Sequence, residues 1–172
     1  MITHVILDGY NMIHARNFPG KKGRSLEEQR NYLIHLIKQY AARKRIPCTI
    51  VFDSKFPFSR QQKNYYRVTV RYSPAHTEAD QVIQQMVRQS KQPHTLLVVS
   101  SDREIQHTAK IHGARVMTSE SFLKEEIAPF PSTSTQPKEP EDSKPDATLS
   151  DQEIAEWLRL FSQGEANEDV DS

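Results

Sequence analysis

The chain has 172 residues, of which 36% are hydrophobic, enough for one domain with a complete core and too few for two. No apolar run approaches the roughly 18 residues of a membrane span, and the short N-terminal run lacks the basic flank of a signal peptide. The single cysteine, Cys48, cannot form an internal disulfide, and we expect it to be a buried small hydrophobe in a reduced, cytoplasmic protein.

The net charge of +1 hides an asymmetry along the chain. Residues 1–130 hold 20 Lys and Arg against 11 Asp and Glu, whereas residues 131–172 hold 3 against 11. Within residues 16–71 the count is 14 basic to 3 acidic. Such a basic segment is typical of a surface that binds a phosphate backbone, although charges scattered over solvated faces would give the same count. We favour phosphate binding for the basic segment and a solubilising role for the acidic tail.

Short apolar runs recur along the first 117 residues. Runs of this length, rich in Val and Ile, predict buried strands, and the alternation of Val68 and Val70 with polar residues predicts a half-exposed strand. The predicted strands span residues 2–7, 48–53, 67–72, 95–100 and 114–117.

Helical patterns lie between these strands. Ser25 and Glu28 form a capping box, Thr77 is the expected N-cap of the second helix, and Ser101-Asp102 opens the third, which Gly113 ends. The helices run from Ser25 to about Arg45, from Thr77 to about residue 91, from Asp102 to His112, and over residues 119–127. Their expected apolar stripes are Leu26, Leu33, Ile37 and Tyr40; Val82, Ile83, Met86 and Val87; and Ile105, Ala109 and Ile111.

Two stretches are expected to be loops, residues 12–24 and 54–66. The second interleaves cations with aromatic residues, a combination that suits single-stranded RNA because bases stack and phosphates pair. An equally weighted alternative is that Phe56 and Phe58 only pin the loop to the domain. Strands that alternate with helices predict an α/β fold with a mainly parallel sheet covered on both faces.

The composition changes after the last predicted helix. We expect a domain over residues 1–128, a disordered acidic linker rich in Pro, Ser and Thr over 129–148, an amphipathic helix over 149–163 and a disordered acidic tail over 164–172. An isolated helix of this length is marginal in water, so we expect it to dock on its own domain or on a protein partner. The docking residues would be Ile154, Trp157, Leu158 and Phe161.

Carboxylates follow three of the predicted strands, at Asp8, Asp53 and Asp102, and two more, Glu78 and Asp80, open a helix. Each alone has a local explanation as a turn or first-turn acid. Together they would lie at the carboxyl edge of one parallel sheet, where such sheets bind ligands. Clustered carboxylates repel one another unless a cation lies among them, and Mg²⁺ or Mn²⁺ suits an all-oxygen site.

Such an ion beside a basic surface suits phosphodiester hydrolysis. The sequence has no glycine-rich phosphate-binding loop and no zinc-type spacing of His and Cys, which argues against ATP, dinucleotides and zinc.

Four short motifs, taken together, resemble the NYN domain, a nuclease branch related to PIN domains, and its YacP-like subfamily in particular. These are Leu7-Asp8-Gly9-Tyr10-Asn11-Met12-Ile13, Val51-Phe52-Asp53, Thr77-Glu78-Ala79-Asp80-Gln81-Val82-Ile83 and Val99-Ser100-Ser101-Asp102-Arg103-Glu104-Ile105, followed by Gly113-Ala114. The resemblance covers about residues 1–128 and implies a three-layer α/β/α, PIN-like (Rossmann-like) domain. It also implies a metal-dependent endoribonuclease that cuts single-stranded RNA. In bacteria, YacP-like members include a ribosome-associated enzyme that cuts mRNA during translation, so we expect RNA, and the ribosome, as partners.

The resemblance also assigns site residues. Asp8, Asn11, Asp80 and Asp102 match the catalytic positions, and Asp8, Asp80 and Asp102 would hold Mg²⁺ or Mn²⁺. Asp53, Glu78 and Ser101 would support them. The expected RNA-binding residues are Tyr10, Lys21, Lys22, Arg24, Lys55, Arg60 and Lys63.

Two alternatives to the nuclease stay open. One is a non-catalytic RNA- or ribosome-binding adaptor of the same fold, which the full set of acids disfavours. The other is a phospho-acceptor domain of flavodoxin-like fold, which usually has paired acids after its first strand, where this chain has Gly9 and Tyr10. Metal-dependent cleavage of RNA separates the nuclease from both.

Overall fold

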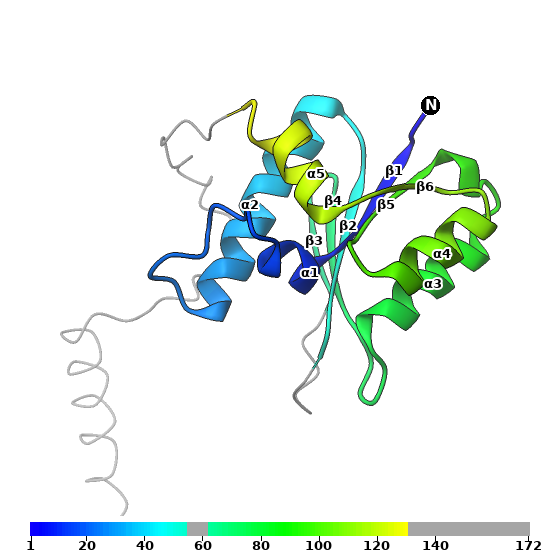
Figure 1. The fold of residues 1–172 in the computed structure, drawn as a ribbon, viewed down its shortest axis with the longest axis horizontal. Coiled ribbons are helices and arrows are strands. Elements are labelled where there is room, and N and C mark those ends of the chain that lie inside the picture. The colour runs from blue at the N-terminus through cyan, green and yellow to red at the C-terminus, as the bar shows by residue number, and fades with distance from the viewer. Residues whose placement is uncertain (55–61, 131–172) are drawn as a thin grey trace, which may run out of the picture. The chain divides into compact units, whose positions relative to one another are not determined.

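The computed structural model of the chain describes residues 1–54 and 62–130, which contain one six-stranded sheet (Figure 1). The strand order is β3-β4-β2-β1-β5-β6, and every pairing is parallel except that of β3 with β4. The strands are β1 (His4–Asp8), β2 (Cys48–Phe52), β3 (Lys63–Tyr65), β4 (Val68–Tyr72), β5 (Leu96–Val99) and β6 (Arg115–Met117). The predicted α/β fold with a mainly parallel sheet is confirmed.

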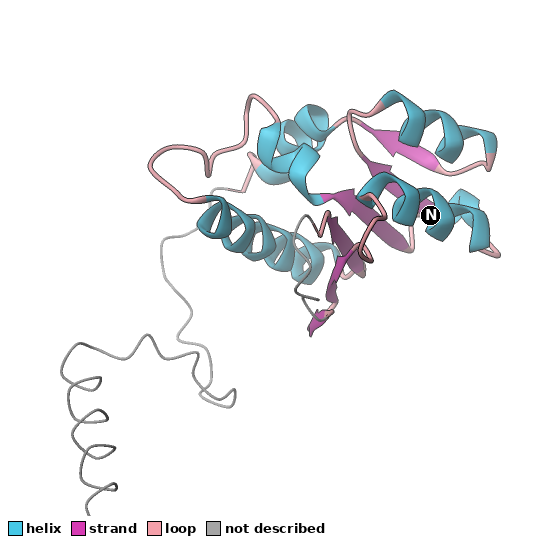
Figure 2. Cartoon of the chain, turned by 90° about the horizontal axis from the view of Figure 1, so that it is seen from below, coloured by secondary structure: helices cyan, strands magenta, loops and turns pink. Residues whose placement is uncertain are grey.

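Helices cover both faces of this sheet (Figure 2). They are α1 (Gly9–His14), α2 (Leu26–Lys44), α3 (Ala79–Gln89), α4 (Arg103–Ile111) and α5 (Ser119–Phe122), with short turns η1 (Pro93–Thr95) and η2 (Leu123–Ile127). Because side chains alternate along a strand, Val5 and Leu7 of β1 face one layer and Ile6 faces the other. The first layer holds α1, α2 and α5, and the second holds α3 and α4.

The capping box of α2 forms as predicted. The backbone N–H of Glu28 donates to Ser25 Oγ at 3.3 Å, and the Ser25 N–H donates to Glu28 Oε2 at 2.6 Å. At the other end Arg45 adopts a left-handed conformation with φ 58°. The predicted stripe of α2 is wrong at its first residue, because Leu26 is 47% exposed, whereas Leu33, Ile37 and Tyr40 are buried.

Both predicted loops contain regular structure. Residues 12–14 belong to α1, which forms because the Asp8 side chain caps it and because Met12 and Ile13 are fully buried. Lys63–Tyr65 is strand β3, which pairs antiparallel with β4 and gives that strand its second neighbour. The loop predictions at these positions are therefore wrong.

Two details of the predicted helices are also wrong. The N-cap of α3 is Glu78 and not Thr77. The carboxylate of Asp53, the residue after β2, accepts from the first free N–H of this helix, that of Ala79. Ile111 of α4 is 67% exposed, because it lies two residues, or about 200°, around the helix from the buried Ala109. Gly113 ends α4 with φ 84°, as expected of a glycine in that place.

Cys48 is buried in β2, as predicted, and burial raises the pKa of its thiol to about 12. No helix in the described part of the chain is long and apolar enough to cross a membrane. Residues 131–172 lie outside the described residues, and so do most of the predicted linker, the predicted helix over 149–163 and the predicted tail.

Candidate functional site

Asp8 ends β1 and begins α1, so it lies where the central strand of the sheet meets a helix. Its Oδ1 accepts a hydrogen bond from the Asn11 N–H at 3.3 Å, and its Oδ2 accepts one from Ser100 Oγ at 3.5 Å. The next residue must be small, because a Cβ on Gly9 would lie 2.3 Å from the ring of Phe52. The packing of α1 against β2 therefore requires a glycine directly after Asp8.

The ionised form of Asp8 is disfavoured in this environment. Burial is the main cause, and the negative charges of Asp53 and Asp102 add to it, while the Asn11 N–H opposes it. Together they raise the pKa of Asp8 to about 6, from an ordinary value of 3.8. Three of the predicted carboxylates therefore interact electrostatically where β1, β2 and β5 end, because the charges of Asp53 and Asp102 both act on Asp8.

Asp53 and Asp102 also stabilise the helices that follow them. Asp53 Oδ1 accepts a hydrogen bond from the Ala79 N–H at the start of α3. Asp102 Oδ1 caps α4 by accepting from the N–H groups of Glu104 at 2.8 Å and Ile105 at 3.2 Å. Each of these caps uses one carboxylate oxygen, Oδ1.

The side chain of Asn11 is held by two serines, one after β5 and one after β6. Its Oδ1 accepts from the Ser101 N–H at 2.8 Å and from Ser119 Oγ at 2.6 Å. A backbone N–H can only donate, so the side-chain atom that faces Ser101 must be the oxygen. The amide nitrogen of Asn11 is consequently the part of this side chain that can serve a ligand.

Sequence reasoning missed Ser119 and Glu120. The Ser101 hydroxyl donates to Glu120 Oε2 at 2.6 Å and accepts from the Ser119 N–H at 3.1 Å, so Ser101 joins these two residues to the end of β5. This bond is the main reason why the pKa of Glu120 lies below its ordinary value. The sequence did contain a signal for Glu120, because this acid lies three residues after the end of the last predicted strand, as Asp8, Asp53 and Asp102 lie at the ends of earlier ones.

The two acids of the Thr77–Ile83 motif contribute differently. Asp80 is half-buried in the first turn of α3, where its Oδ1 accepts from the Gln81 N–H at 2.7 Å. Glu78 is exposed and makes no side-chain cap. Of the described carboxylates, those that raise the pKa of Asp8 are Asp53 and Asp102. The structure therefore gives Asp53, predicted to be a supporting residue, a more direct part at this edge than Glu78.

The described residues include no group of three or more His, Cys, Asp or Glu side chains close enough together to enclose a metal ion. The carboxylates at this edge therefore influence one another electrostatically, but those that the structure describes do not by themselves surround a metal ion.

The predicted RNA-binding residues are distributed over several elements. Lys21 donates to the carbonyl of His14 at 3.0 Å, and the guanidinium of Arg24 lies 4.5 Å from the ring centroid of Tyr32. Lys22 and Lys63 are exposed. Tyr10 of α1 is half-buried, with its ring edge-on to Phe52 at 5.2 Å between centroids. The other two predicted residues, Lys55 and Arg60, lie outside the described residues.

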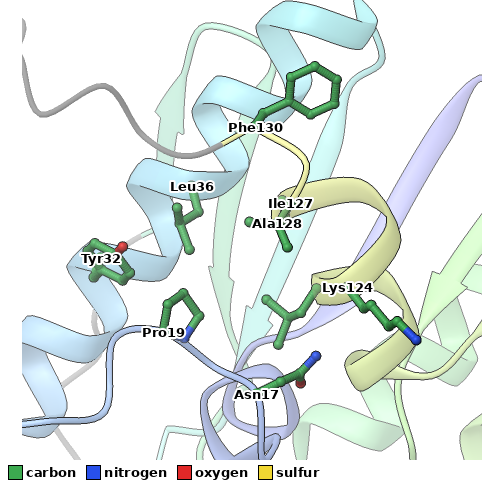
Figure 3. A pocket seen from close by; sticks show the side chains of 9 residues that line it. Asn17, Pro19, Tyr32, Leu36, Lys124, Ile127, Ala128 and Phe130 are labelled. Atoms are coloured by element: carbon green, nitrogen blue, oxygen red, sulfur yellow. The ribbon is translucent and has the colours of Figure 1, made fainter.

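A pocket of about 540 Å³ lies between α2 and η2 (Figure 3). Side chains of α2, including Tyr32 and Leu36, line it opposite those of η2, including Leu123 and Ile127. None of the predicted catalytic residues lines it.

The mainly parallel sheet, the two helical layers and the acidic carboxyl edge define an α/β/α domain with carboxylates at the ends of its central strands. The chain belongs to the YacP-like NYN domain family, whose sequence model matches residues 5–162. The match runs past the four motifs within residues 1–128 and includes most of the predicted helix over 149–163, so the family extends beyond the domain boundary drawn from the motifs.

Two solved structures share the fold, both of Rae1 (YacP) from Bacillus subtilis. One is a crystal structure of a mutant with a single tryptophan replaced by leucine, which is 21% identical with a TM-score of 0.61, over 96% of this chain and 87% of that one. A second crystal structure of Rae1 (YacP) is also 21% identical, with a TM-score of 0.56 over 93% and 82% of the two chains. No curated protein sequence is significantly similar to this chain.

Proposed function

We propose that this protein is a metal-dependent endoribonuclease that hydrolyses phosphodiester bonds of single-stranded RNA. The observation that carries the proposal is the electrostatic state of Asp8, whose ionisation is opposed by burial and by the charges of Asp53 and Asp102. A cation bound among these like charges would relieve their repulsion, and perturbed pKa values of this kind are frequent at functional sites. Membership of a nuclease-like family gives the proposal its reaction class.

The donor atoms at this edge fit Mg²⁺ or Mn²⁺. They are carboxylate oxygens, the ligands that these ions prefer, and Asp102 keeps its Oδ2 outside its helix cap. Asp8 and Asp102 would hold the ion, and Asp80 would complete the site or orient water. When bound, such an ion polarises a phosphoryl oxygen and lowers the pKa of a coordinated water.

The chain's own groups would position the RNA. The amide nitrogen of Asn11, fixed by the bonds of its oxygen to Ser101 and Ser119, would donate to a phosphate oxygen. The exposed Lys22 and Lys63 would attract the backbone of the strand. In this proposal mRNA is the substrate, and the ribosome is a partner that presents it.

The experiment that tests the proposal compares the wild type with Asp8→Asn and Asp102→Asn. Each protein is incubated with labelled single-stranded RNA and with translating ribosomes, in Mg²⁺ or Mn²⁺ and in EDTA. We expect cleavage by the wild type that EDTA abolishes and that each substitution lowers at least about a hundredfold. Glu125→Gln, which neutralises an exposed acid of η2, is the matched control and should keep full activity.

The outcomes separate the candidate functions. Cleavage on ribosomes alone would mean that a partner positions the substrate. Binding of RNA without cleavage under any condition would contradict the nuclease and support the adaptor. The adaptor is the second candidate because the described carboxylates do not by themselves enclose a metal ion.

A further inference from the structure

A buried arginine lies beside the acidic edge without a carboxylate partner. Arg30 of α2 is only 8% exposed, and its Nη1 donates a hydrogen bond to the hydroxyl oxygen of Tyr10 at 2.9 Å. Among the described residues, no acid forms an ion pair with it. A buried guanidinium is costly unless its charge is compensated, and a neutral phenol supplies no charge. The structure therefore contains a cation whose counter-charge is still to be identified.

The carboxylates of the edge do not supply that counter-charge. The charges that act on Asp8 are those of Asp53 and Asp102, both negative, and Arg30 is not among them. An anion that does not belong to the described residues is the partner that remains.

Tyr10 connects Arg30 to the edge of the sheet. It comes two residues after Asp8, and its ring packs edge-on against Phe52, the residue that directly precedes Asp53. Because its hydroxyl oxygen accepts from Arg30, the proton of that hydroxyl can be donated only to a second acceptor. A charged donor also polarises the phenol and makes it a stronger donor in turn.

We propose that Tyr10 and Arg30 form a subsite for one backbone phosphate of the RNA, next to the phosphate that is cut. The Tyr10 hydroxyl donates to a non-bridging oxygen, and the Arg30 guanidinium supplies the positive charge and holds the phenol in place. This inference rests on the proposed function, because it takes RNA as the ligand. Arg30 acts here as a positioning residue, and neither side chain takes part in breaking the bond.

The alternative is a purely structural clamp between α1 and α2, since the pair also joins these two helices. A clamp predicts a loss of thermal stability and an effect on RNA binding that is the same whichever phosphate is neutral. A phosphate subsite predicts an effect that depends on the charge of one particular phosphate. The two hypotheses therefore differ in a quantity that can be measured.

The test measures binding of a fluorescent 12-nucleotide single-stranded RNA to the full chain in EDTA, by anisotropy. Tyr10→Phe keeps the ring and removes only the hydroxyl, and Arg30→Met keeps an unbranched, apolar side chain in α2 and removes the charge. We expect each substitution to weaken binding about tenfold, as for the loss of one charge-assisted hydrogen bond. We expect the double variant to bind about as weakly as the weaker single variant, because the two residues act together.

Salt dependence and neutral phosphates provide the specific readouts. Arg30→Met should reduce the slope of log Kd against log salt by about 0.7, the value for one contact with a single strand. In a series of RNAs that each carry one neutral methylphosphonate, the effect of Arg30→Met should disappear at a single position. The matched control is Arg88→Met on α3, which removes an exposed arginine bonded to Gln84 and should change neither readout.

The inference is overturned if both variants bind RNA as the wild type does, or if their deficit is equal for every methylphosphonate position. Tyr10→Phe alone decides the matter if Arg30→Met fails to fold. Failure of the proposed function gives a different pattern, since binding in EDTA needs no cleavage. A wild type that binds but never cleaves would refute the nuclease and leave the subsite intact. A double variant that binds and cleaves RNA as well as the wild type would refute the subsite alone.

Discussion

The Asp53 carboxylate accepts a hydrogen bond from the backbone N–H of Ala79, so the residue that follows β2 caps helix α3 from 26 positions away in the sequence. The adjacent N-cap residue, Glu78, makes no cap of its own. An acid at the carboxyl edge of this sheet therefore has two effects at once. It fixes the start of a helix, and it adds a negative charge that raises the pKa of Asp8.

This relationship predicts that Asp53→Ala destabilises the protein and that Thr77→Ala does not. Loss of the cap should lower the free energy of unfolding by about 1–2 kcal/mol, the usual cost of removing a capping carboxylate. Thr77 lies before the observed N-cap, so its replacement should change stability by less than about 0.5 kcal/mol. Urea denaturation of both variants provides the measurement. Equal decreases in the free energy of unfolding would contradict the prediction, because they would mean that Thr77 contributes as much to the start of α3 as Asp53 does.

A second prediction concerns Asp8→Asn in the absence of metal. The pKa of Asp8 is about 6 in the folded chain and 3.8 ordinarily, so the stability that its proton contributes is complete below about pH 4 and is lost as the pH rises through 6. Asparagine is an equally good N-cap and carries no charge. In EDTA at pH 8 the variant should be more stable than the wild type by about 1–3 kcal/mol, since one pKa unit corresponds to about 1.4 kcal/mol.

The check is chemical denaturation of both proteins at pH 4.5, 6 and 8. The difference in stability should grow from the lowest to the highest pH, and Mg²⁺ should reduce it at pH 8 by neutralising the wild-type carboxylate. A difference that is the same at all three pH values would contradict the assignment of the pKa to Asp8.

A third prediction concerns Ser119→Ala. Removal of the hydroxyl leaves Asn11 Oδ1 with one donor, the Ser101 N–H, so the amide is held less firmly. If Asn11 acts in the proposed reaction, kcat should fall by about tenfold while KM stays unchanged, because misplacement of a catalytic group affects mainly the chemical step. Ser119→Cys, which retains a weak donor, should recover part of the loss, and a rise in KM alone would contradict the prediction.

A fourth prediction compares two hydrophobic residues of the helices. Phe122 is fully buried and packs edge-on against Tyr40, with ring centroids 5.0 Å apart, whereas Ile111 is exposed. Phe122→Ala should therefore cost about 3–5 kcal/mol of stability. Ile111→Ala should stay within about 0.5 kcal/mol of the wild type. Thermal denaturation of the two variants checks the prediction, and similar midpoint temperatures would contradict it.

Local patterns in the sequence predicted most of the fold. The capping box of Ser25 and Glu28, the apolar runs of β1, β2 and β5, and Gly113 after α4 each act through neighbours a few residues away. Their signal is therefore complete within a short window. The same locality made α1 hard to predict, because six residues form a helix here only when Asp8 caps them and the core buries Met12 and Ile13.

The sequence by itself determined that carboxylates follow the strands of a parallel sheet, because the residue that ends such a strand reaches the same edge whatever the rest of the chain does. Only the tertiary structure decided how those side chains are used. It turned the carboxylate of Asp53 toward Ala79, the amide oxygen of Asn11 toward Ser119, and the guanidinium of Arg30 toward Tyr10. Each of these bonds joins residues at least 20 positions apart, and their distances and burial arise only when the layers pack together.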